Sequence, residues 1–184
     1  MSHYNTELIE TNIARFKTIM KDYSGERTIL FDADNTLYQF STYGNVAKSL
    51  SLCYSKGFFK NLPIFAEAPI VIENLQRLGL RCGIISALVD SPFCNTEKRE
   101  SFGYYFPMIK PEDIYLIPEG TNKTSVIKDV EHTILVDYFH GNINDWYEAG
   151  GIAIKKSYSG KPRPVPVVTS LIDLFPILHE LNVY

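Results

Sequence analysis

The sequence contains little cysteine and no paired cysteine motif. Its three cysteines, Cys53, Cys82 and Cys94, are odd in number and widely spaced, and no C-x-x-C pair occurs. Neither a disulfide framework nor a zinc site is therefore expected, and reduced thiols are typical of a cytoplasmic protein. Cys82 lies in an apolar run, and we interpret it as a small core residue rather than a reactive thiol.

Long apolar runs and concentrated positive charge are also missing. No stretch approaches the length of a membrane span, and residues 1–22 lack the apolar segment of a secretory signal. No run of lysine or arginine exceeds two residues and the formal net charge is -3, so the basic surface that binds polymeric DNA or RNA is not expected. The sequence thus predicts a cytoplasmic protein that binds neither membranes nor nucleic-acid polymers.

The composition is that of an ordinary globular protein. Hydrophobic residues make up 45% of the 184 residues and charged residues 21%, a balance that allows one sizeable core. We therefore expect residues 1–184 to form a single domain. Whether that domain is a monomer or a homodimer is left open by the sequence.

Short apolar runs alternate with amphipathic segments along most of the chain. Strands that alternate with helices predict an α/β fold, a Rossmann-like parallel sheet with helices on both faces. The proline-rich segment 157–166 is expected to be an extended surface connection. The expected strands are 28–31, 81–85, 114–117, 133–136 and 152–154, and the expected helices are 7–22, 67–78, 96–102, 124–129, 143–149 and 171–181.

One aromatic-rich stretch interrupts this alternation. Residues 37–66 fit neither the strand nor the helix rhythm of the rest, so we expect a small helical cap inserted into the domain. Its aromatic side chains either form the core of the cap or line a binding site, and both alternatives stay open. These side chains are Tyr38, Phe40, Tyr43, Tyr54, Phe58, Phe59 and Phe65.

Polar residues follow several of the expected strands where parallel strands end together, the edge at which open α/β sheets bind ligands. They are Asp32, Asp34, Ser86 and Asp137, and Lys123 opens the segment before the strand at 133–136. Two carboxylates one residue apart repel each other unless a cation lies between them. Mg²⁺ fits, because it prefers carboxylate oxygens and bridges to phosphate. Turn contacts and helix caps are the plain structural alternatives for these residues.

The ordered set of motifs resembles the haloacid-dehalogenase (HAD) superfamily. The D-x-D-x-T-L pattern of residues 32–37 is similar to the first motif, Ser86 to the second, Lys123 to the third, and residues 135–137 to the fourth. Many relatives carry a second acid after the fourth-motif aspartate, whereas this sequence has Tyr138.

The resemblance implies a HAD-like fold and a magnesium-dependent phosphomonoesterase. It implies that Asp32 is the nucleophile and Asp34 the general acid and base. Ser86 and Lys123 would bind the phosphate group. The Mg²⁺ ligands it implies are Asp32, Asp34 and Asp137. A carboxylate nucleophile splits hydrolysis into two displacements through an acyl-phosphate.

Within the superfamily, the sequence most resembles the 5'(3')-deoxyribonucleotidases. The similarity lies in Phe40, in the run 57–59, and in the segment 86–98 with its Glu97 and Lys98. It implies a nucleoside monophosphate substrate whose base stacks on Phe40. Two alternatives remain: a phosphatase for another small phosphorylated metabolite, and a non-catalytic binding protein with the same fold. A dehalogenase is disfavoured by the presence of Asp34.

Overall fold

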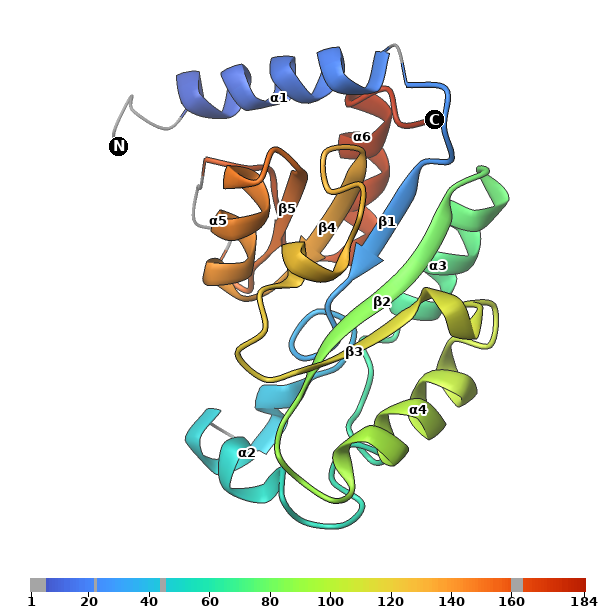
Figure 1. Ribbon diagram of the computed structural model, residues 1–184, viewed down its shortest axis with the longest axis vertical. Helices are drawn as coiled ribbons and strands as arrows, with labels where there is room; N and C mark the ends of the chain where they lie inside the picture. Colours follow the sequence, from blue (N-terminus) through green and yellow to red (C-terminus); the bar gives the residue numbers. More distant parts are fainter. Residues whose placement is uncertain (1–5, 22, 44–45, 160–163) are drawn as a thin grey trace.

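The computed structural model describes residues 6–21, 23–43, 46–159 and 164–184 of the chain (Figure 1). Its centre is a six-stranded sheet with the order β3-β2-β1-β4-β5-β6, in which each pair of neighbouring strands is parallel. The strands are β1 (Thr28–Phe31), β2 (Arg81–Leu88), β3 (Ile114–Pro118), β4 (Thr133–Asp137), β5 (Ile152–Lys156) and β6 (Val167–Val168). The predicted α/β fold with a parallel sheet is confirmed.

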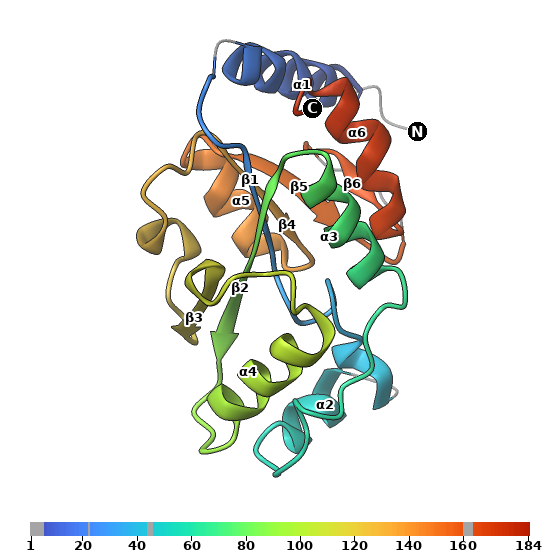
Figure 2. The ribbon, with the colours of Figure 1, turned by 90° about the vertical axis from the view of Figure 1, so that its right-hand side faces the viewer.

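Helices cover both faces of the sheet (Figure 2). Along β1, Ile29 and Phe31 pack into a core cluster with α3 and α6, whereas Leu30 points to the other face and packs with residues of α5. This alternation follows from the period of two in a strand, and burial on both faces explains why the strands read as continuous apolar runs. The helices are α1 (Thr6–Lys21), α2 (Val46–Leu52), α3 (Ala68–Arg77), α4 (Cys94–Tyr105), α5 (His140–Glu148) and α6 (Leu174–Glu180).

The first helix closes the amino-terminal end of the sheet. Figure 1 shows α1 lying across that end, next to α6. Phe16 and Met20, two of the apolar residues spaced along α1, are fully buried, as an amphipathic helix packed on the main body requires. Among the described residues, no helix combines the length and the apolar character needed to cross a membrane.

Two expected elements differ from those observed. The expected helix at 124–129 is a single short 3-10 turn, η3 (Lys123–Val126), and the Asn122 side chain caps its start by accepting a hydrogen bond from Thr124 N. The helix expected at 171–181 begins as a 3-10 turn, η4 (Leu171–Asp173), and continues as α6. The other 3-10 turns are η1 (Phe40–Tyr43) and η2 (Pro111–Asp113).

The short edge strand β6 was not expected. It pairs with the end of β5 through Lys155 and Val167, and through Lys156 and Val168. Two residues carry too little pattern to predict a strand from sequence. The described part of the proline-rich segment leads directly into β6, whereas Pro162 lies outside the described residues.

The segment 37–66, which we call the cap segment, leaves the sheet and returns to it at nearly the same point. Gln39 N donates to Pro63 O at 2.8 Å and Phe65 N donates to Leu37 O at 2.9 Å, so the two ends of the segment are joined. Between these ends lie η1 and α2. Figure 1 shows α2 beyond the carboxyl ends of β1 and β2, at the end of the sheet where the predicted catalytic residues follow the strands.

Candidate active site

The loop after β1 places two aspartates at the carboxyl end of the sheet. Asp32 N donates to Val136 O at 2.9 Å, which continues the pairing of β1 with β4 by one residue. The chain then turns sharply around Ala33 O, which accepts from the backbone N–H of residues 36, 37 and 38. Asn35 adopts a φ of 61° in this turn. Asparagine tolerates this left-handed region better than most residues, so it can take the position without a glycine.

Lys123 joins two of the predicted site residues. Its Nζ lies 2.7 Å from Asp32 Oδ1 and 2.7 Å from Asp137 Oδ2, and its side chain is only 3% exposed. Burial alone would lower the pKa of the Lys123 ammonium, but the charges of Asp32 and Asp137 outweigh it and raise the pKa. The lysine therefore stays charged and holds the ends of β1 and β4 together.

Asp137 is fully buried at the end of β4 and receives further hydrogen bonds. Phe139 N donates to its Oδ1 at 2.6 Å and Asn142 Nδ2 donates to its Oδ2 at 2.8 Å. Burial, followed by the charge of Asp32, raises the pKa of Asp137 to about 6 despite the nearby Lys123. Asn142 thus supports the Asp137 carboxylate directly, whereas the nearby Asp145 accepts from Asn122 Nδ2.

A second buried lysine, Lys98 of α4, holds the other aspartate. Its Nζ donates to Asp34 Oδ2 at 2.7 Å, to Ser86 Oγ at 2.7 Å and to Ala87 O at 2.9 Å. Ser86, at the carboxyl end of β2, is therefore linked to Asp34 through this ammonium. Lys98 was part of the resemblance, but no function was assigned to it from sequence. A charged residue in a helix is normally expected to be exposed to solvent.

The two aspartates of the loop differ in their surroundings. Lys123 contacts Asp32, and Thr36 Oγ1 donates to Asp32 Oδ2 at 3.3 Å. Asp34 contacts Lys98 and its side chain is 29% exposed. Burial, followed by the repulsion of Asp32, raises the pKa of Asp34 even though Lys98 acts to lower it. A carboxyl group with a raised pKa next to a carboxylate that a lysine and a threonine hold is the arrangement expected of an acid and a nucleophile.

The carboxylates of the site are the type of ligand that Mg²⁺ prefers, although they do not form a cluster of three. Among the described residues, no three histidine, cysteine, aspartate or glutamate side chains gather closely enough to hold a metal ion. Asp32 Oδ1 and Asp137 Oδ2 share the Lys123 ammonium, which leaves Asp32 Oδ2 and Asp137 Oδ1 as the carboxylate oxygens without a lysine contact in the described part of the chain. Two hard carboxylate oxygens match a cation that takes few protein ligands and completes its shell with water and substrate phosphate. Asp34 as a third ligand stays a prediction.

Tyr138, in the place of the second acid, is part of an aromatic cluster beside the site. Lys155 Nζ lies 4.8 Å from the centre of its ring, and Tyr158 meets it edge-on with the ring centres 5.7 Å apart. A phenol is a poor ligand for Mg²⁺. The ring instead contributes to packing at the ends of β4 and β5.

Phe40 lies in the cap segment with most of its ring covered. Its side chain belongs to the hydrophobic core, the residue is 7% exposed, and Phe58 packs edge-on against it with 5.5 Å between ring centres. Little of the ring surface remains for a nucleobase. Base stacking on Phe40 therefore stays a prediction, whereas its packing role is observed directly.

Replacing Phe40 with alanine tests which role dominates. We expect a loss of about 3–5 kcal/mol in the free energy of unfolding, as for other buried phenylalanines. The specificity constants for a deoxynucleoside monophosphate and for p-nitrophenyl phosphate should fall by similar factors, measured alongside the melting temperature. A loss of roughly ten- to a hundredfold confined to the nucleotide would instead assign Phe40 to the base.

The order and parallel pairing of the strands, with helices on both faces, give this chain a HAD-like, Rossmann-like α/β fold. No family model matches the chain, and no curated protein sequence matches it. The HAD hydrolase YfnB of Bacillus subtilis, bound to magnesium, shares 17% identity at a TM-score of 0.59, over 85% of this chain and 99% of that chain.

Two further solved structures show the same likeness with different activities in their names. A dehalogenase shares 14% identity at a TM-score of 0.57, over 85% of this chain and 98% of that one. The D,D-heptose 1,7-bisphosphate phosphatase of Burkholderia thailandensis shares 10% identity at a TM-score of 0.54, over 86% and 98%. Likeness at such low identity establishes the fold and leaves the activity to be argued from the site.

Proposed function

We propose that this chain is a magnesium-dependent phosphomonoesterase that forms a phosphoryl intermediate on Asp32. The proposal depends above all on the separation of the two loop carboxylates between two buried lysines. Asp32 is held by Lys123, and Asp34 by Lys98. Because each carboxyl group has its own lysine partner, one can act as a nucleophile while its neighbour acts as a proton donor.

The reaction proceeds in two displacements. In the first, a carboxylate oxygen of Asp32 attacks phosphorus, and the bond between phosphorus and the ester oxygen breaks while Asp34 gives its proton to that oxygen. In the second, a water molecule attacks phosphorus and loses a proton to Asp34. Inorganic phosphate leaves, and the Asp32 carboxylate is restored. The raised pKa of Asp34 favours the protonated form that the first step needs.

The charge on the phosphoryl group is matched by donors around Asp32. A lysine ammonium has three N–H groups, and two of those on Lys123 go to Asp32 and Asp137. The third is available for a phosphate oxygen. Ser86 Oγ accepts from Lys98, so its own O–H is free to donate to the same group. Mg²⁺ held by Asp32 and Asp137 would neutralise further charge on the phosphate.

Asp34 also favours a phosphatase over a dehalogenase. Displacement of a halide leaves an anion that needs no proton, whereas displacement of an alcohol from phosphorus gains from a positioned acid. Asp34 is held beside Asp32 by an ion pair with the buried Lys98. Such a placement is costly without a role for the carboxyl group.

For the substrate we propose a nucleoside monophosphate, on the motif resemblance and the aromatic cap segment. Phe59 of that segment lies next to the site, with 4.9 Å between its ring centre and Lys98 Nζ. The proposal is tested by release of phosphate from p-nitrophenyl phosphate and from a panel of ribo- and deoxyribonucleotides with Mg²⁺. Hydrolysis of the aryl ester without any preferred nucleotide would leave a phosphatase for another metabolite. No hydrolysis of any ester would contradict the proposed activity.

Removal of Mg²⁺ should abolish this activity, and its return should restore it. Asp137→Asn should weaken the apparent affinity for Mg²⁺ by roughly ten- to a hundredfold, because the amide replaces a charged oxygen ligand. Tyr138→Phe is the matched control and should leave the affinity unchanged. Titration of activity with Mg²⁺ after chelation measures both variants, and full activity in the chelated protein would refute the metal requirement.

A further inference from the structure

Lys98 uses all of its hydrogen-bonding capacity on the protein. An ammonium group has three N–H donors and no acceptor. Lys98 directs them to Asp34 Oδ2, Ser86 Oγ and Ala87 O, and its side chain is 3% exposed. None remains for a substrate phosphate, in contrast to Lys123. Lys98 must therefore act through the residues that it holds.

The contact with Asp34 is made on one oxygen. Lys98 Nζ binds Asp34 Oδ2, and among the described residues no hydrogen bond reaches Asp34 Oδ1. A proton carried on Oδ1 can then be passed to the leaving oxygen while Oδ2 stays bound. The lysine thus fixes the orientation of the carboxyl group without occupying the oxygen that reacts.

Glu97, the residue before Lys98, makes the equivalent attachment to the cap segment. Its carboxylate accepts from Gly57 N at 2.5 Å and from Phe59 N at 3.1 Å, and the residue is 6% exposed. Charge-assisted bonds from two backbone N–H groups hold the 57–59 turn firmly against α4. Successive residues of one helix therefore hold the cap segment and the proton donor.

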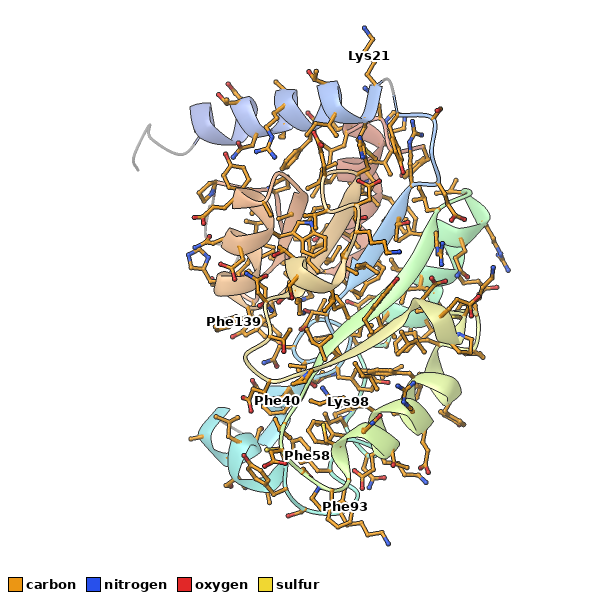
Figure 3. The ribbon with its side chains drawn as sticks, in the orientation of Figure 1. Lys21, Phe40, Phe58, Phe93, Lys98 and Phe139 are labelled. Carbon is orange, nitrogen blue, oxygen red and sulfur yellow. The ribbon has the colours of Figure 1, made fainter. Side chains whose placement is uncertain are left out.

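Phe59 contacts both members of this pair. Its backbone N–H donates to Glu97, and the centre of its ring lies 4.9 Å from Lys98 Nζ, within the range of a cation–π contact. Figure 3 shows Lys98 between the carboxyl ends of the strands and Phe58, which follows Gly57 in the cap segment. A movement of the 57–59 turn would change the surroundings of Lys98 directly.

We propose that Glu97 and Lys98 form a brace that couples the position of the cap segment to the orientation of Asp34. Lys98 is a positioning residue for proton transfer to the leaving group, and Glu97 ties that position to the cap segment. The brace rests on the proposed phosphomonoesterase activity, because it assigns Asp34 the role of proton donor. Its effect is greatest for substrates whose leaving group needs a proton.

Two esters of similar size separate positioning from general damage. Benzyl phosphate releases an alcohol and depends on a proton donor, whereas p-nitrophenyl phosphate releases a stable anion and depends on it little. Lys98→Met should lower kcat/KM for benzyl phosphate by roughly 10²-fold or more, the usual contribution of a general acid, and for p-nitrophenyl phosphate by less than about tenfold. Lys98→Arg, which restores the charge with a different shape, should fall between Lys98→Met and the unaltered protein.

The control for this comparison is Arg99→Met. Arg99 is an exposed cation of α4 whose Nε donates to Asn95 Oδ1 on the same helix. Its removal should change neither kcat/KM value. Equal losses on both esters in Lys98→Met would overturn the positioning role and leave Lys98 a structural residue.

The contact between Glu97 and the cap segment is tested by a measurement that does not depend on enzyme activity. Glu97→Gln keeps the shape of the side chain but replaces one accepting oxygen by an NH₂ group, so one of the two backbone N–H groups loses its partner. Amide hydrogen exchange should become at least about tenfold faster in the peptide that contains residues 57–59, and the benzyl phosphate selectivity should shift in the same direction as in Lys98→Met. Unchanged exchange would refute the anchor. If the unaltered protein hydrolyses neither ester, the proposed function fails and Asp34 loses the role that the brace needs, even where exchange upholds the Glu97 anchor.

Discussion

Asp32→Asn is expected to lower turnover by at least ~10³-fold while the fold is retained, because an amide cannot form the acyl-phosphate intermediate. The shape of the side chain is preserved, and Oδ1 can still accept from Lys123, which contacts that atom in the structure. The melting temperature should therefore change little. The loss should be equally severe for p-nitrophenyl phosphate, because even a good leaving group needs the nucleophile.

The measurement needs protection against two artefacts. Asparagine can deamidate back to aspartate, so the mass of the peptide that contains residue 32 must be verified in the sample assayed. The Arg99→Met protein, purified in parallel, should keep full activity and thereby shows that the purification does not itself inactivate the protein. Appreciable turnover by a verified Asp32→Asn protein would reject the covalent mechanism.

Asp34→Asn is expected to be impaired by roughly 10²- to 10⁴-fold, through loss of the general acid and base. The defect should differ between the two chemical steps. With p-nitrophenyl phosphate the first step needs little proton donation, but the second has lost the base that accepts a proton from water. The variant should therefore release p-nitrophenolate in a burst that approaches the amount of enzyme, followed by slow turnover.

Rapid mixing with p-nitrophenyl phosphate measures this burst. Benzyl phosphate should show no burst, because the step that needs the proton donor is then slowed as well. A steady rate without a burst for the aryl ester, together with a large loss of activity, would argue that Asp34 acts before the chemical steps, for example in metal binding.

The fold was predictable because its strands are buried on both faces. Runs such as 28–31 and 133–136 are apolar after an initial threonine, and they match β1 and most of β4. β2 extends to Leu88, three residues past the predicted end. Its last two residues are only partly buried, so the apolar pattern that marks a buried strand is weaker there. The edge strand β6 has two residues and the 3-10 turn at Lys123 has four, so each spans only about one period of its pattern, too little to be predicted from sequence.

The strand-end residues came together as the topology of a parallel sheet requires. Asp32 and Asp137 follow neighbouring strands, so the sheet itself brings them to Lys123. Lys98 could not be placed by the same reasoning. It lies on a helix with a weak apolar pattern, and a Glu97–Lys98 pair in such a helix reads as a solvated surface. Only the packing of the cap segment against α4 buries the pair and aims it at Asp34.

Phe40 shows the complementary limit of sequence reasoning. Its position after Asp34 suggested the resemblance to the deoxyribonucleotidases, but the sequence does not tell how much of the ring remains uncovered. The structure buries it against Phe58, with 7% of the residue exposed. An aromatic residue near a site is as consistent with cap packing as with substrate contact.

The most direct test of the central claim is to find the phosphoryl group on Asp32. The protein is mixed with p-nitrophenyl phosphate and Mg²⁺, quenched in acid within the first turnover, digested, and analysed by mass spectrometry. One phosphoryl group is expected on the peptide that contains Asp32, localised to that residue, absent in Asp32→Asn and enriched in Asp34→Asn. Phosphate released within that turnover by an active protein, with no phosphoryl group on Asp32 in either the unaltered protein or Asp34→Asn, would contradict the claim.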